Sequence, residues 1–218
     1  MAKLRPFRDY DEKDVINLYS MDLSAGTNAG GAIDVSGANN DWEGKLSHGH
    51  VVAVGGVGGW NKGQELHEML GDAGAGSSGL SNVTVQRYGV TAKLRSAGAA
   101  LVPLGLTLFH VAQYDENGEH LKFNPRKASE LEACIEGQAV PVVTRGLFLV
   151  NGIDETDQGD TNAVPISQAW LDAGGALYAG ANGSITTGVN NGSVALVKIG
   201  RALGLDHSDG DILIKLEL

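Results

Sequence analysis

Glycine constrains the fold of this chain more than any other residue type, because it occupies 32 of the 218 positions. That is about twice the share of roughly 7% found in ordinary proteins. Glycine weakens helices and supplies the positive φ angles that tight turns need. The glycines follow no Gly-X-Y period, and 42% of the residues are hydrophobic, enough to build a core. Together these features favour many short β-strands joined by turns.

Alternating and short apolar runs place the expected strands along the chain. They cover residues 32–35, 51–54, 83–90, 104–111, 139–143, 146–150, 176–179, 184–187, 194–199 and 211–218. An Asn-Gly pair at 117–118 separates the apolar runs 106–114 and 120–123. Such a pair between apolar alternating runs predicts a β-hairpin.

Two segments favour short helices. Residues 124–134 combine a capping Asn124, Pro125 at the first helical position and Gly137 to end the helix. Residues 62–70 form the second candidate. The predicted fold class is therefore mainly β. We expect a compact β-barrel-like or β-sandwich-like body with one or two short helices, a Gly-rich loop lobe and an extended N-terminal arm.

Composition divides the chain into three parts. Residues 1–20 alternate cationic and acidic side chains, and Pro6 disfavours helix before it, which indicates an extended arm. Residues 21–82 are a Gly-rich lobe of loops and strands, and residues 83–218 are a β-rich body. The alternative is that residues 21–218 form one domain.

The charge balance narrows the possible partners. The net charge is −10 and no basic run is visible, so nucleic acid is not an expected partner. No stretch approaches the roughly 20 apolar residues of a membrane-spanning helix, and the N-terminus lacks the apolar region of a signal peptide. The single cysteine, Cys134, excludes a disulfide within the chain and is expected to be a small buried residue.

Candidate catalytic and metal-binding patterns are weak. His48 and His50 form an H-x-H pair that needs a third ligand, either His67 or a carboxylate. The acidic segments 154–160 and 206–211 lack the spacing of a calcium loop, and the second is interpreted as a turn before the last strand. No G-x-S-x-G, dinucleotide or Walker A motif occurs. We therefore expect no enzyme and assign no catalytic, cofactor or metal residues.

Several segments resemble a known family. They are RPFRDYDEKDVINL at 5–18, GLTLFHVAQYDENG at 105–118, NPRK at 124–127, EGQAVPVVTRG at 136–146, GALYA at 175–179, GRALG at 200–204 and DGDILIKLEL at 209–218. In their residues and in their order along the chain, these segments resemble head decoration (capsid cement) proteins of tailed phages, especially marine and cyanobacterial ones. The Gly-rich lobe departs from the recognised pattern.

The resemblance implies a structural virion protein that stabilises the phage head by bridging major capsid protein subunits. It implies a compact β-barrel-like body, a homotrimer at three-fold or quasi-three-fold positions, and a place on the outer surface of the capsid. The protein would be made in the host cytoplasm and would contact neither nucleic acid nor membrane.

The arm is the expected capsid-binding element. Its residues are Arg5, Pro6, Phe7, Arg8, Asp9 and Tyr10. Aromatic side chains there would enter grooves of the shell, and the arginines would pair with its carboxylates. Two alternatives stay open: a head-surface adhesin that binds host glycans through Trp42 and Trp60, and a metal-dependent hydrolase built on His48 and His50.

Overall fold

The computed structural model describes residues 3–20, 48–55, 93–98, 101–111, 115, 117, 119, 121–134, 139–155, 164–180, 183–191, 194–206 and 209–218. The strands predicted at 32–35 and 83–90 and the helix predicted at 62–70 lie outside these residues, as does most of the Gly-rich lobe. The described chain is mainly β with short helices, as the sequence predicted.

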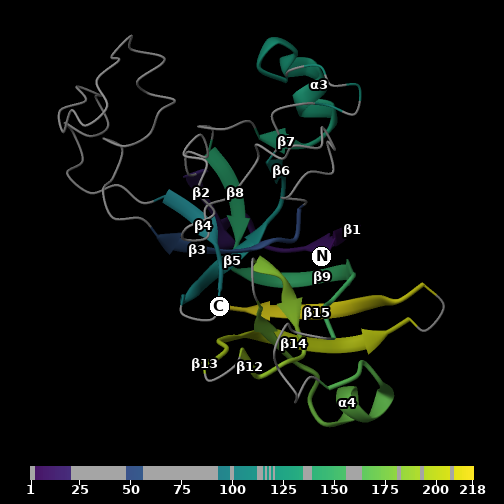
Figure 1. Cartoon of the computed structure of the whole chain (residues 1–218). Coiled ribbons are helices and arrows are strands. Elements are labelled where there is room, and N and C mark those ends of the chain that lie inside the picture. Colours follow the sequence, from purple (N-terminus) through teal and green to yellow (C-terminus); the bar gives the residue numbers. More distant parts are fainter. Residues whose placement is uncertain are drawn as a thin grey trace.

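Five strands close a small barrel, shown in the upper half of Figure 1. Their order is β2 (Val15–Ser20), β4 (Lys93–Ser96), β3 (Val51–Gly55), β5 (Pro103–Thr107) and β8 (Ala139–Val143). The β2–β4 pair is parallel and the other neighbours are antiparallel. Closure leaves none of these strands with an open edge.

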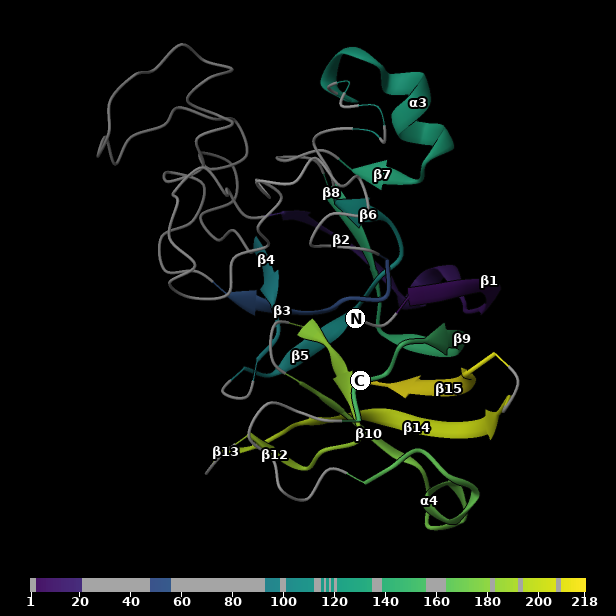
Figure 2. The ribbon, with the colours of Figure 1, turned by 45° about the vertical axis from the view of Figure 1, so that its right-hand side comes forward.

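A six-stranded sheet lies below the barrel (Figure 2). Its order is β1 (Lys3–Asp9), β9 (Arg145–Asn151), β15 (Asp211–Glu217), β14 (Lys198–Leu205), β10 (Ala176–Ala179) and β11 (Ile185–Thr186). All pairs are antiparallel. Side chains along β15 alternate between buried and partly exposed, so one face of the sheet packs on the core.

Barrel and sheet share one core. The largest buried cluster joins Val51, Leu106 and Val143 of the barrel with Phe148 and Ile214 of the sheet. The chain also passes directly between the two layers, because β8 leads into β9. The two layers are therefore parts of one packed body.

Short elements complete the described chain. They are the parallel pair β6 (His110–Val111) and β7 (Ala133–Cys134), the hairpin of β12 (Asn190–Asn191) and β13 (Val194–Ala195), the 3-10 turns η1 (Glu12–Asp14) and η3 (Leu121–Phe123), and the helices α3 (Pro125–Glu130) and α4 (Gln168–Asp172). Helix α4 was not predicted, although the Ser167 hydroxyl accepts a hydrogen bond from the Trp170 amide, as an N-cap does.

The predicted division between an arm and a body needs correction. Residues 3–9 form β1, which pairs with β9, and residues 15–20 form β2, which pairs with β8 and β4. The backbone is extended as predicted, but it is built into both layers of its own chain. Strand β3, which falls within the predicted Gly-rich lobe, likewise belongs to the barrel.

The predicted hairpin at 106–123 is wrong in its second half. The turn exists, since the Asp115 carboxylate accepts hydrogen bonds from the amides of Asn117 and Glu119. Residues 121–123 then form a 3-10 turn, and β6 pairs instead with β7. Helix α3 starts at Pro125 as predicted but stops at Glu130, because Glu132 adopts a φ of 47° and turns the chain toward β7.

Candidate binding surface

Strand β1 displays most of the predicted capsid-binding residues. Leu4 pairs with Val150 and Arg8 pairs with Phe148, so the three residues between them bulge out of the ladder. Within this bulge Arg5, Pro6 and Phe7 are exposed, with 51% of Phe7 open to solvent. Pro6 has no amide hydrogen, and proline on an edge strand discourages pairing with a further strand. The strand therefore offers side chains to a partner rather than a free hydrogen-bonding edge.

The two arginines of β1 have partners within the chain. Arg5 pairs with Asp211 at 2.9 Å, and Arg8 pairs with Glu132 at 3.2 Å and also donates to the Leu108 carbonyl at 3.4 Å. Carboxylates of a capsid, the predicted partners of these arginines, would therefore have to compete with Asp211 and Glu132.

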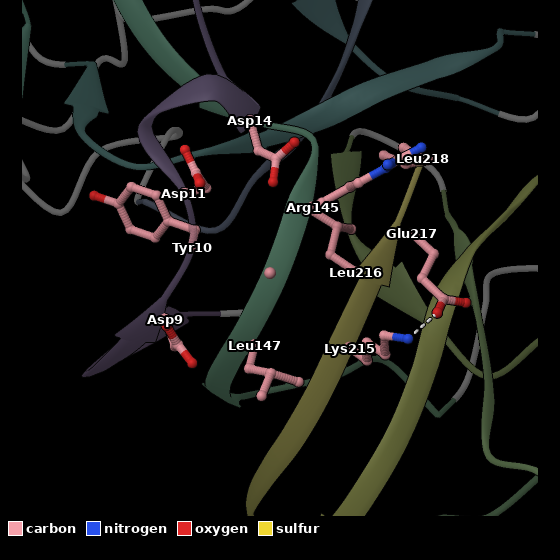
Figure 3. Close-up of a pocket in the computed structure, with 11 residues that line it drawn as sticks. Asp9, Tyr10, Asp11, Asp14, Arg145, Leu147, Lys215, Leu216, Glu217 and Leu218 are labelled. Carbon is pink, nitrogen blue, oxygen red and sulfur yellow. Dashed lines mark ion pairs between the residues drawn. The ribbon is translucent and has the colours of Figure 1, made fainter.

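An open groove of about 630 Å³ lies where β1 ends (Figure 3). Three segments line it: the end of β1 with the chain that follows it, the start of β9, and the end of β15 with the residue after it. The lining residues are Asp9, Tyr10, Asp11, Asp14, Arg145, Gly146, Leu147, Lys215, Leu216, Glu217 and Leu218. Of the predicted arm residues, Asp9 and Tyr10 belong to this groove.

The groove wall is held by close packing at Gly146. The Tyr10 ring stacks on Phe148, with ring centroids 5.9 Å apart. A side chain at Gly146 would lie 2.7 Å from the Asp9 carbonyl oxygen and 2.9 Å from the Phe148 ring, and Gly146 has a φ of 147°. Only glycine fits this backbone position, so the start of β9 can pass close beneath Asp9.

Charges of both signs line the groove. Asp11 is occupied as the cap of η1, where its side chain accepts from the Lys13 amide. Lys215 forms an ion pair with Glu217, and this contact holds the pKa of Glu217 below its usual value. Arg145 is exposed and forms no ion pair within the described parts of the chain. Such a lining of leucines and of charges of both signs suits contact with another protein surface.

The two histidines of the H-x-H pair do not face one site. Residues 48–50 form a turn, not a strand. The His48 ring lies against His110, with centroids 4.4 Å apart, whereas His50 is fully buried against Gly183. His67, the proposed third ligand, lies outside the described residues. The structure therefore separates the two ligands that the metal-hydrolase alternative requires.

Cys134 is buried, as predicted, and its thiol contacts the Ala139 carbonyl at 3.4 Å. Burial raises the pKa of Cys134 to about 11, which keeps the thiol protonated and unreactive at neutral pH.

The acidic segment 206–211 turns into β15, as predicted. The Gly210 amide donates to the Asp206 carbonyl, and Gly210 has a φ of 69°. Residues 156–160 of the other acidic segment lie outside the described residues, as do Trp42 and Trp60. Among the residues that are described, no group of three or more His, Cys, Asp or Glu side chains is placed to hold a metal ion.

No helix in the described part of the chain is long and apolar enough to cross a membrane. Comparison of the chain with protein-family models, with curated proteins and with solved structures finds no match. The groove was not predicted because its three walls come from residues 9–14, 145–147 and 215–218. No local pattern signals that these segments meet.

Proposed function

We propose that this protein is a structural component of a tailed-phage head, which decorates the capsid and bridges subunits of the major capsid protein. One observation carries the proposal: an exposed aromatic bulge on β1 adjoins an open groove of mixed charge. The sequence resemblance supports the same class. The partner is the outer surface of the shell, and the protein acts there as a homotrimer.

The surface has the character of a protein-docking site. Phe7 is half exposed on a strand that is anchored to the core through Leu4, so its side chain is presented from a strand of the packed body. Fully burying such a ring contributes roughly 1.5–3 kcal/mol. Several copies around a symmetry axis multiply modest contacts of this size.

Deletion of the N-terminal residues is a poor test of this function. Deleting residues 1–19 would remove strands from both the sheet and the barrel, so loss of binding would not separate a docking role from misfolding. A substitution on the exposed bulge avoids this problem. Phe7→Ser removes the ring and leaves Leu4 in the core.

The test is co-sedimentation of the purified protein with expanded heads assembled without it. Wild type should sediment with the heads, and Phe7→Ser should bind at least about tenfold more weakly, as expected for loss of a buried aromatic anchor. Phe123→Ser is the matched control, because Phe123 is 81% exposed on η3. Wild-type protein that stays in the supernatant would contradict the function. Equal loss in both variants would contradict the role of the bulge.

A further inference from the structure

The outer face of the six-stranded sheet carries a charge pattern that differs from the rest of the protein. This outer face consists of the side chains on β9, β15, β14 and β10 that point away from the core. Its charged members are Arg145, Lys198, Arg201 and Lys215 against Asp211 and Glu217. The whole chain has 16 Lys and Arg against 26 Asp and Glu. A cationic face therefore stands on an acidic protein.

Two cations on this face lie directly opposite each other. Arg201 of β14 pairs in register with Lys215 of β15, and like charges in that position destabilise an isolated sheet. On the far side of β14, Lys198 lies opposite Tyr178 of β10. The pKa of Glu217 is lowered by Lys215, its ion-pair partner, and also by Arg201 and Lys198.

The carboxylates of the face are already engaged. Glu217 pairs with Lys215 (Figure 3), and Asp211 pairs with Arg5 and accepts from the Asn151 amide group at 2.7 Å. Within the described parts of the chain, Lys198 and Arg201 form no ion pair. Lys198 and Arg201 are therefore exposed cations that can still pair with an anion of another molecule.

A strip of leucines runs beside these cations. Leu149 of β9 pairs in register with Leu213 of β15, which pairs in turn with Gly204 of β14. Leu203 sits at the bulge next to Gly204 and is 41% exposed. None of these three leucines belongs to the buried clusters of the described residues.

We infer that the outer face docks onto an acidic protein surface that carries an apolar ridge, with Lys198 and Arg201 pairing with its carboxylates. The inference rests on the proposed function, in which that surface belongs to the capsid shell. Arg5 and Arg8 are already paired within the chain. Lys198 and Arg201 of β14 therefore make the contacts with capsid carboxylates that were expected of those two arginines. The leucine strip fills the apolar centre of the interface and the cations form its rim.

A protein fits this face better than a nucleic acid does. Lys198, Arg201 and Arg145 are too few to neutralise the six to ten phosphates of a typical duplex contact. Glu217 stands among the cations and would repel phosphates, whereas a protein rim commonly mixes both signs. The leucines would gain nothing from a sugar–phosphate backbone.

The experiment uses the double variant Lys198→Gln/Arg201→Gln and the same expanded heads. Wild-type binding should weaken as salt rises, and the double variant should bind at least about tenfold more weakly with a shallower salt dependence. Its melting temperature should stay close to that of wild type, because both side chains are exposed and neither forms an ion pair within the described parts of the chain. The control is Arg126→Gln, which removes one exposed positive charge on helix α3.

The outcomes separate the two proposals. If wild type fails to bind the heads, the proposed function falls. If wild type binds and the double variant binds equally well with the same salt dependence, the docking face is wrong and the function stands. Retention of wild type on duplex DNA at about 0.15 M salt, lost in the double variant, would assign the face to nucleic acid and overturn the inference.

Discussion

The Leu4 amide donates a hydrogen bond of 3.0 Å to Nδ1 of His48, so a turn residue helps to hold strand β1 in place. The bond requires a neutral imidazole, because a protonated ring has donors on both nitrogens. Arg8 and Lys3 on β1, Glu132 before β7 and His110 on β6 face or contact this ring. Burial, reinforced by Arg8, lowers the pKa of His48 below 6.5.

Acid should therefore loosen β1. The pKa of His48 is lower in the folded protein than in the unfolded chain. The neutral ring therefore contributes its full stability above the pKa of the unfolded chain, near 6.5, and this contribution is lost as the pH falls through the pKa of the folded protein. Amide hydrogen exchange of residues 3–9, corrected for intrinsic rates, should accelerate between pH 7 and pH 5. His48→Asn keeps an acceptor for the Leu4 amide without titrating, so it should abolish this local dependence. Identical pH profiles in wild type and His48→Asn would show that the hydrogen bond between Leu4 and His48 does not hold β1.

His50 should make the whole fold acid-sensitive. Burial lowers the pKa of His50 to about 3, so the folded protein keeps this ring neutral while the unfolded chain protonates it below about 6.5. Over that range the free energy of unfolding should fall by about 1.4 kcal/mol per pH unit from this group alone. His50→Met has similar volume and does not titrate. Urea unfolding at pH 6 and pH 4 should show a shallower loss in the variant, and parallel losses would contradict the assignment.

Gly183 should tolerate no side chain. It has a φ of 74°, and a β-carbon there would overlap the buried His50 ring. Gly183→Ala should lower the free energy of unfolding by about 3 kcal/mol, from overpacking and backbone strain together. Gly174→Ala is the control, since Gly174 has a φ of 107° but nothing within 4 Å of a β-carbon. Its cost should be about 1 kcal/mol, from strain alone. Equal costs in urea unfolding would show that the overlap with His50 is relieved.

Local patterns predicted the strands that alternate cleanly. Residues 139–143 and 211–218 gave the positions of β8 and β15 because their apolar side chains face one core. The error at 120–123 has a different origin, since the partner of β6 lies more than twenty residues away at Ala133. Register between remote segments depends on tertiary packing, which no short window contains.

The candidate surface was less predictable than the fold. The placement of Phe7 in an extended segment was predicted from the charges and the proline around it, but the bulge in β1 was not. The contacts between charged side chains were not predicted. Arg5 pairs with Asp211, which is 206 positions away in the sequence, and Arg201 lies opposite Lys215 only because of the register between β14 and β15. Strand β2 was missed although Val15, Ile16 and Leu18 are apolar, because the charges before them resembled a free arm.

Leu4→Ala distinguishes a free arm from a strand of the body. Leu4 is 4% exposed in the shared core, so truncation should lower the global free energy of unfolding by about 2–4 kcal/mol. A separate arm would give no change. Phe7→Ala, three residues later on the exposed bulge, should alter stability by less than about 0.5 kcal/mol. The two substitutions thus test whether Leu4 stabilises the fold while Phe7 does not, and urea unfolding measures the free energy of both variants. Unchanged stability in Leu4→Ala would mean that β1 does not hold the body together.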